Sequence, residues 1–131
     1  MCGLYGIYSN HKDIVINQLY DSINAINHRG PDNTGIWIND TNDIGFAHNR
    51  LSIIDLSSNA NQPMVSECKN YVIIFNGEIY NYKDLREEIK NEGLSFKTDS
   101  DTEVLLNSYI LWGSNCNEKL KGMFAYAIYN K

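Results

Sequence analysis

The sequence predicts an α+β fold in which neighbouring strands pair antiparallel, and three observations lead to this prediction. Residues 71–75 are β-branched or aromatic and carry no charge, which is typical of a buried strand. Apolar residues recur at helical spacing over residues 14–26, and a capping box begins another helix at residue 100. The predicted order is therefore strand, helix, three strands, two helices and a final strand.

The elements of the first half of the chain follow from local patterns. Residues 3–8 form a short, mostly apolar segment, so we expect a strand there. The helix over residues 14–26 ends at His28-Arg29-Gly30-Pro31-Asp32, a segment rich in helix breakers. Strands are expected at residues 35–38 and 44–48, because a polar turn of Asn, Asp and Thr separates two apolar runs.

In the second half, residues 51–56 are a further extended apolar stretch, and a polar loop follows them. Residues 71–75 are expected to be buried on both faces of a sheet. A helix is predicted over residues 81–92, where a glycine closes it, and the helix that begins at the capping box continues over residues 104–112. Residues 123–129 form the last predicted strand.

The composition excludes several classes of function. The 131 residues are enough for one domain, and the net charge of −5 argues against a sequence-independent nucleic-acid binder. No apolar run approaches the length of a membrane span, and no signal peptide is recognisable. The three cysteines lack metal-binding spacing, and the three histidines add no ligand set, with His11 expected on the surface. We therefore expect a cytoplasmic protein with no metal site.

Cys2 is the first candidate for chemistry. Removal of Met1 would leave this residue with a thiol and a free α-amine. An α-amine titrates near neutral pH, so it can act as the base that activates the thiol. The alternative is that a cysteine stands at position 2 by chance, so other residues have to support the catalytic interpretation.

Asn76-Gly77-Glu78 follows the predicted buried strand directly. One interpretation is a hairpin turn, for which Asn-Gly is a strong signal. The other is an oxyanion hole, in which the Asn76 side-chain amide and the Gly77 backbone N–H donate to one oxygen.

Two charged residues have a structural and a functional interpretation. Arg50 follows a predicted strand and is one of three arginines; it is either a solvated charge or a fork that holds a carboxylate. Asp101 lies in the capping box, where an acid favours the helix dipole. Its functional interpretation is a carboxylate that holds an ammonium group.

Taken together, these segments resemble the class II glutamine amidotransferase domain of glutamine-hydrolysing asparagine synthetases. Seven motifs match in the family's order over nearly the whole chain. They are Met1-Cys2-Gly3, His28-Arg29-Gly30-Pro31-Asp32 with Gly35, His48-Asn49-Arg50-Leu51-Ser52-Ile53-Ile54-Asp55, Gln62-Pro63-Met64, Phe75-Asn76-Gly77-Glu78-Ile79-Tyr80-Asn81, Ser100-Asp101-Thr102-Glu103 and Leu120-Lys121-Gly122-Met123-Phe124-Ala125.

The resemblance implies a four-layer αββα fold of the N-terminal-nucleophile hydrolase type. It also implies that Cys2 attacks the side-chain amide of L-glutamine and that Asn76 and Gly77 stabilise the oxyanion. The products would be glutamate and ammonia, formed through a γ-glutamyl thioester.

Binding roles are implied in the same way. Arg50 would hold the α-carboxylate of glutamine, and Asp101 with Glu78 would hold its α-ammonium group. The backbone of four consecutive residues would line the pocket: Leu51, Ser52, Ile53 and Ile54.

The resemblance covers one part of the family's proteins. We expect residues 1–131 to be a glutamine amidotransferase domain that is incomplete at its C-terminus. The Ser-Gly-Gly-x-Asp-Ser loop of the synthetase domain does not occur in this sequence. No cofactor is therefore expected here, and ATP and Mg would serve only a synthetase domain or partner subunit that accepts the ammonia.

Two alternatives stay open at this point. A truncated chain could bind glutamine or a partner protein without turnover. An amidotransferase of the same chemistry could also serve another acceptor, such as a sugar or a secondary metabolite.

Overall fold

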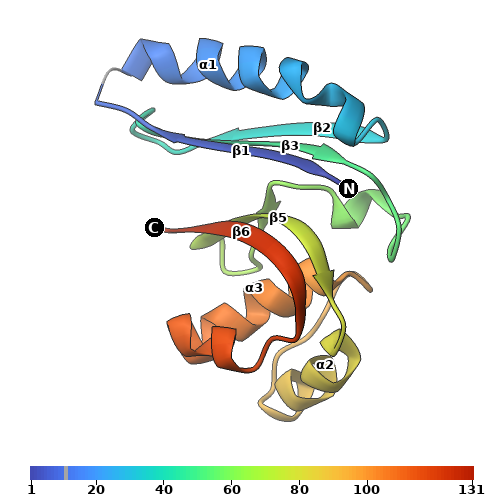
Figure 1. Ribbon diagram of the computed structural model, residues 1–131. Helices are drawn as coiled ribbons and strands as arrows, with labels where there is room; N and C mark the ends of the chain where they lie inside the picture. The colour runs from blue at the N-terminus through green and yellow to red at the C-terminus, as the bar shows by residue number, and fades with distance from the viewer. Residues whose placement is uncertain (11) are drawn as a thin grey trace.

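Two antiparallel sheets lie face to face, with one helix covering the outer face of the first and two helices covering the second (Figure 1). The computed structural model describes residues 1–10 and 12–131, so His11 lies outside the described residues. The strands are β1 (Gly3–Tyr8), β2 (Asn33–Ile38), β3 (Ile44–Arg50), β4 (Met64–Val65), β5 (Tyr71–Ile79) and β6 (Gly122–Asn130). The α-helices are α1 (Lys12–Ala25), α2 (Tyr82–Asn91) and α3 (Asp101–Trp112). Short 3-10 helices cover Asn27–Arg29, Ser58–Ala60 and Gly113–Glu118.

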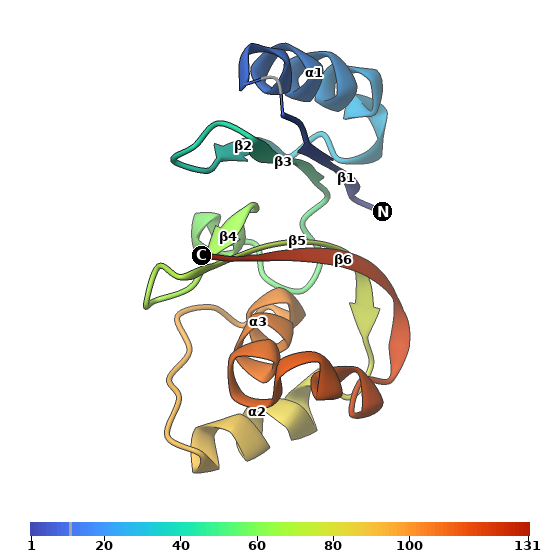
Figure 2. The same cartoon turned by 90° about the vertical axis from the view of Figure 1, so that its left-hand side faces the viewer.

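Each sheet is built around one central strand. The first has the order β1-β3-β2 and the second the order β4-β5-β6, with all pairs antiparallel. β3 and β5 therefore each pair with both other strands of their sheet. Figure 2 shows the two sheets stacked edge-on, with α1 on one side and α2 and α3 on the other.

Three apolar clusters fill the spaces between these layers. Leu19 and Ile23 of α1 pack with Ala47 against the first sheet. Val72 and Ile74 of β5 face Phe46 between the sheets. The other face of β5, through Ile73 and Phe75, packs against α2 and α3 in the largest cluster. The prediction that residues 71–75 include a strand buried on both faces is confirmed.

The structure corrects the hairpin-turn interpretation of Asn76-Gly77. β5 continues through both residues to Ile79, and Asn76 pairs with Ala125 while Gly77 pairs with Phe124. The backbone of Gly77 has φ +151°, and a Cβ placed there would lie 2.3 Å from the carbonyl oxygen of Met123. Glycine is required because β6 approaches this backbone too closely for a side chain.

Three further details differ from the sequence-based expectation. β3 extends to Arg50 rather than ending at residue 48, and residues 51–56 form an irregular loop. The two-residue strand β4 was not predicted, because so short a run has no recognisable pattern.

Among the described residues, no helix is long and apolar enough to cross a bilayer.

Candidate active site

A cavity of about 200 Å³ lies where the ends of β3 and β5 meet the N-terminus and the first turn of α3. Nine of the residues predicted for a site line it: Cys2, Arg50, Leu51, Ile53, Ile54, Asn76, Gly77, Glu78 and Asp101. Ser52 is not among the lining residues, and its backbone N–H instead donates to the Asp32 carboxylate at 2.7 Å. Segments far apart in sequence therefore bring one thiol, one guanidinium and, with Asp55, three carboxylates to a shared space.

Cys2 is fixed by contacts to its sulfur and to its backbone. The N–H of Leu51 donates to Cys2 Sγ at 3.3 Å, and Sγ lies 3.6 Å from the carbonyl oxygen of the same residue. Arg29, from the segment after α1, donates through Nε to the Cys2 carbonyl oxygen at 3.0 Å. The sequence motif around Arg29 was noted, but spacing alone gave no sign that this side chain holds Cys2.

Arg50 is buried, with 6% of its surface exposed. Its Nη1 donates to the carbonyl oxygen of Ser57 and to Asn61 Oδ1, both at 2.7 Å, and its Nη2 donates to the carbonyl oxygen of Asp55. A guanidinium has five N–H donors, so these contacts leave two. Two donors match one carboxylate held in bidentate fashion.

The edge of β5 that faces away from β6 carries the candidate oxyanion donors. Backbone groups of alternate residues in an antiparallel strand point to the same edge. On this edge Phe75 N–H donates to Gln62 Oε1 at 2.6 Å, and Ile79 N–H donates to Asp101 Oδ2 at 3.1 Å. Gly77 lies between them, so its N–H points to the same edge. No contact between described residues occupies that N–H or the Asn76 side-chain amide, so both remain available to a ligand.

Asp101 and Glu78 bring negative charge to the cavity that Cys2 also lines. Asp101 is the first residue of α3 and is 5% exposed. Burial raises the pKa of Asp101, and the charge of nearby Glu78 raises it further, while backbone N–H donors act in the opposite direction. A cation between the two carboxylates would relieve both effects. The site therefore favours an ammonium group here.

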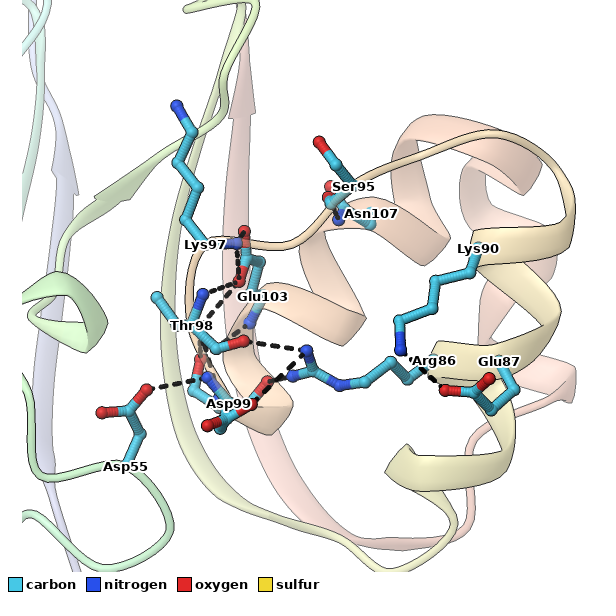
Figure 3. Close-up of polar contacts among 11 residues, drawn as sticks. Asp55, Arg86, Glu87, Lys90, Ser95, Lys97, Thr98, Asp99, Glu103 and Asn107 are labelled. Atoms are coloured by element: carbon cyan, nitrogen blue, oxygen red, sulfur yellow. Dashed lines mark hydrogen bonds and ion pairs between the residues drawn. The ribbon is translucent and has the colours of Figure 1, made fainter.

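A polar network fixes the segment that leads into Asp101 (Figure 3). The Glu103 carboxylate accepts from the N–H groups of Lys97 and Thr98, at 2.9 and 2.7 Å. Arg86 of α2 donates to the carbonyl oxygens of Thr98 and Ser100 at 2.8 and 3.2 Å. In a capping box Glu103 would reach the N–H of Ser100. Only half of that motif forms, since Ser100 Oγ accepts from the N–H of Glu103 while the carboxylate reaches further back.

Asp55 joins this segment to the loop around Arg50. Its Oδ2 accepts from the N–H of Asp99 at 2.8 Å, and its Oδ1 accepts from the N–H of Ser57 at 2.7 Å. Burial pushes the pKa of Asp55 upward, but hydrogen bonds from Ser57 and Asp99 outweigh it and hold the pKa below its usual value. One carboxylate thus connects the loop after Arg50 to the segment that precedes α3 (Figure 3).

Gln62 and Met1 also line the cavity, although the sequence assigned neither a role there. Gln62 was noted only as part of the Gln-Pro-Met motif, and its contact with Phe75 spans 13 positions, which no local pattern predicts. Among the described residues, no group of three His, Cys, Asp or Glu side chains could hold a metal ion.

Comparison with known proteins agrees with this geometry. A family model described as a glutamine amidotransferase domain matches residues 1–131. The chain is 45% identical to asparagine synthetase [glutamine-hydrolyzing] 1 of Bacillus subtilis, covering all of this chain and 21% of that protein. It is 39% identical to asparagine synthetase B [glutamine-hydrolyzing] of Escherichia coli, covering 99% of this chain and 23% of that protein. The chain therefore spans about a fifth of the length of these relatives.

Solved structures share the fold. Glutamine phosphoribosylpyrophosphate amidotransferase from B. subtilis superimposes with a TM-score of 0.77 at 21% identity, covering 99% of this chain and 35% of that one. A structure described as the allosteric regulatory enzyme of purine biosynthesis gives a TM-score of 0.80 at 21% identity, covering 98% and 35%. The predicted αββα fold of the N-terminal-nucleophile type is confirmed.

Proposed function

Because the chain belongs to the glutamine amidotransferase domain family, we propose that it hydrolyses L-glutamine to glutamate and ammonia as the glutaminase module of an asparagine-synthetase-type enzyme. One observation carries the proposal. Cys2, Arg50, Asn76, Gly77 and Asp101 line a single cavity, although they come from four separate parts of the sequence.

The charges of the cavity fit a free amino acid. Arg50 has two N–H donors left for the α-carboxylate, and Asp101 with Glu78 attracts the α-ammonium group. A site that pairs both charges rejects substrates that lack one of them, because its own buried groups would then be unpaired. We therefore propose that N-acetylglutamine and glutamine α-amides are poor substrates.

The reaction begins with removal of Met1, which lines the cavity beside Cys2. The freed α-amine takes the thiol proton while Sγ bonds to the amide carbon of glutamine. The negative oxygen of the tetrahedral intermediate is stabilised by the Asn76 side-chain amide and the Gly77 N–H. The carbon–nitrogen bond then breaks, and the amine returns its proton to the departing ammonia.

A γ-glutamyl thioester remains after ammonia leaves. Water attacks its carbonyl carbon, again with the amine as base and the same two donors on the oxyanion. Breaking the carbon–sulfur bond releases glutamate and restores the thiol. Each cycle therefore consumes one glutamine and one water, with no cofactor.

We further propose that the ammonia passes to an ATP-dependent synthetase domain or partner subunit that makes asparagine. The names of the curated relatives and the fifth of their length that this chain spans support this assignment. ATP and Mg would serve that acceptor alone.

The test is glutamate release from L-glutamine by the chain with Met1 removed, as verified by intact mass. Cys2→Ala should lower the rate by at least 10³-fold, and Asn76→Ala by about 10²–10³-fold. Cys68 is exposed and is not among the residues that line the cavity, so Cys68→Ala is the matched control and should retain full activity. Equal rates for the unaltered chain and Cys2→Ala would refute the proposal.

A further inference from the structure

Both backbone polar groups of Phe75 are held by buried side chains instead of by a neighbouring strand. β4 pairs with β5 at Val72 and Ile73, and within the described part of the chain no strand pairs with the same edge of β5 beyond Ile73. There Gln62 Oε1 accepts from the Phe75 N–H at 2.6 Å, and His48 Nε2 lies 3.0 Å from the Phe75 carbonyl oxygen. Two side chains thus replace the missing strand at one residue.

This residue directly precedes the candidate oxyanion donors. The Phe75 carbonyl belongs to the peptide unit that also contains the nitrogen of Asn76. β6 holds the other edge of the same segment, where Asn76 pairs with Ala125 and Gly77 pairs with Phe124. Fixing Phe75 from the cavity edge therefore completes the restraint on the backbone from which Asn76 and Gly77 extend.

Gln62 also contacts helix α3. Its Nε2 donates to Thr102 Oγ1 at 3.2 Å, and Thr102 is the neighbour of Asp101 in α3. An amide suits both contacts because it carries one acceptor and two donors on one planar group. Gln62 is 6% exposed, so few alternative partners compete for it. One side chain thus links β5, next to the candidate oxyanion donors, to the first turn of α3.

His48 makes the matching contact from the first sheet. The ring is fully buried, and among the described atoms its Nδ1 has no partner. Burial is the main cause that lowers the pKa of His48 to about 4, so the ring is neutral at pH 7. Because the carbonyl of Phe75 can only accept, Nε2 carries the proton and donates. Among residues 1–10 and 12–131, the one polar partner of this buried ring is thus the backbone beside Asn76.

We propose that Gln62 and His48 are positioning residues that hold the Phe75–Asn76 peptide so that the Asn76 amide and the Gly77 N–H converge on the reacting oxygen. The inference rests on the proposed glutaminase function. It predicts that both residues affect the chemical step more than substrate binding, because their hydrogen bonds reach the Phe75 backbone beside the candidate oxyanion donors.

The experiment compares steady-state glutamine hydrolysis by Gln62→Met and His48→Phe with the unaltered chain. Each variant should lower kcat by about 100-fold, the loss expected for a displacement of about 1 Å, while KM changes by less than threefold. His48→Gln restores an N–H donor and should retain at least a third of kcat. Gln18 is exposed on α1, so Gln18→Met is the control for the same substitution and should be unchanged.

A kcat within threefold of the unaltered chain for Gln62→Met and His48→Phe would overturn the inference while leaving the glutaminase function intact. A rise in KM at constant kcat would overturn it as well. Should His48→Phe fail to fold, His48→Gln keeps the test decisive, because a 100-fold loss in that variant contradicts the assigned donor role.

Amide hydrogen exchange separates the inference from the proposed function. In Gln62→Met the Phe75 amide should exchange at least 10-fold faster, while that of Ile74, which pairs with β6, should be unchanged. If the unaltered chain released no glutamate, the proposed function would fail on its own. The exchange of Phe75 would still decide whether Gln62 restrains this peptide, and an unchanged rate would overturn that assignment.

Discussion

β3 and β5 are both central strands, and each carries a tripeptide with polar side chains near its C-terminal end, but the two tripeptides are used differently. His48, Asn49 and Arg50 at the end of β3 are buried, and each is engaged by contacts within the protein. Asn76, Gly77 and Glu78 at the end of β5 are partly or fully exposed. The described contacts leave the Asn76 amide and the Gly77 N–H unoccupied.

This difference distinguishes polar groups that stabilise the fold from polar groups that are free to bind a ligand. The polar groups of β3 hold the layers together, and only the two remaining donors of Arg50 can serve a ligand. On β5, the contacts of Phe75 with Gln62 and His48 and the pairing with β6 hold the backbone in place. The Asn76 amide and the Gly77 N–H remain available to a ligand in the cavity. A polar tripeptide after a buried strand therefore indicates a site only when its donors lack partners in the fold.

Gly77→Ala should have the largest effect on stability, because it tests the backbone of β5 itself. The new Cβ would lie 2.3 Å from the Met123 carbonyl oxygen, so β5 and β6 would have to separate locally. We expect the free energy of unfolding to fall by about 4 kcal/mol in urea denaturation. Gly93→Ala is the control, since Gly93 also has positive φ but open space around it, and it should lose about 1–2 kcal/mol. Similar losses for both would show that the approach of β6 is unimportant.

His48 tests how firmly β3 depends on buried polar groups, through the pH dependence of stability. Its pKa is about 4 in the folded chain and near the ordinary 6.5 when unfolded, so the unfolded state binds more protons between these values. The contribution of neutral His48 to the free energy of unfolding is therefore fully present above about pH 6.5. That contribution falls by about 3 kcal/mol as the pH drops to 4. Asp101 acts in the opposite sense because burial raises its pKa. The informative quantity is the difference between the unaltered chain and His48→Gln in urea unfolding at pH 7 and pH 4.5. An identical pH dependence for the two would contradict the burial of an uncharged ring.

Two asparagines allow a direct comparison of the strands. Asn49 Nδ2 donates to the Ile23 carbonyl oxygen in the last turn of α1 at 2.7 Å, and Asn49 Oδ1 accepts from Thr34 Oγ1. Asn49→Ala should therefore lower the free energy of unfolding by about 2 kcal/mol, because buried groups lose their partners. Asn76→Ala should change it by less than about 0.5 kcal/mol. Equal losses in thermal or urea unfolding would remove the distinction between β3 and β5.

The smallest effect is expected at Asp55, which joins the loop after β3 to the segment before α3. Asp55→Ala removes the acceptor for the Asp99 N–H, and the loss should be at most about 1 kcal/mol because the contact is partly solvated. Lys97→Ala removes an exposed ion pair between the same segment and Glu67. This change should lower the free energy of unfolding by less than about 0.5 kcal/mol. A larger loss for Lys97→Ala than for Asp55→Ala in the same unfolding measurement would argue against Asp55 as the connecting residue.

Much of the fold was predictable because its signals are local. The uncharged run that became the buried part of β5, the spacing of α1 and the Ser100 cap of α3 each lie within a few consecutive residues. The continuation of β5 through Asn76-Gly77 was not predictable, because it depends on pairing with β6, which begins 43 positions after Ile79 in the sequence.

The site divides in the same way. Cys2, Arg50, Asn76, Gly77 and Asp101 were identified because they stand in motifs at the ends of predicted elements, and all of them line the cavity. Ser52 was expected in the pocket, yet its N–H turns to Asp32. The role of Gln62 escaped notice because its importance lies in contacts with Phe75 and Thr102, and only the assembled layers bring these together.

The position of Cys2 decides how the protein should be prepared. Cys2 and the residue before it both line the cavity, whereas the C-terminal end of β6 lies apart from the N-terminus (Figures 1 and 2). An affinity tag at the amino end would fill the pocket and bury the amine in a peptide bond. A tag at the carboxyl end avoids both problems, so an inactive amino-tagged preparation would not test the proposed glutaminase activity.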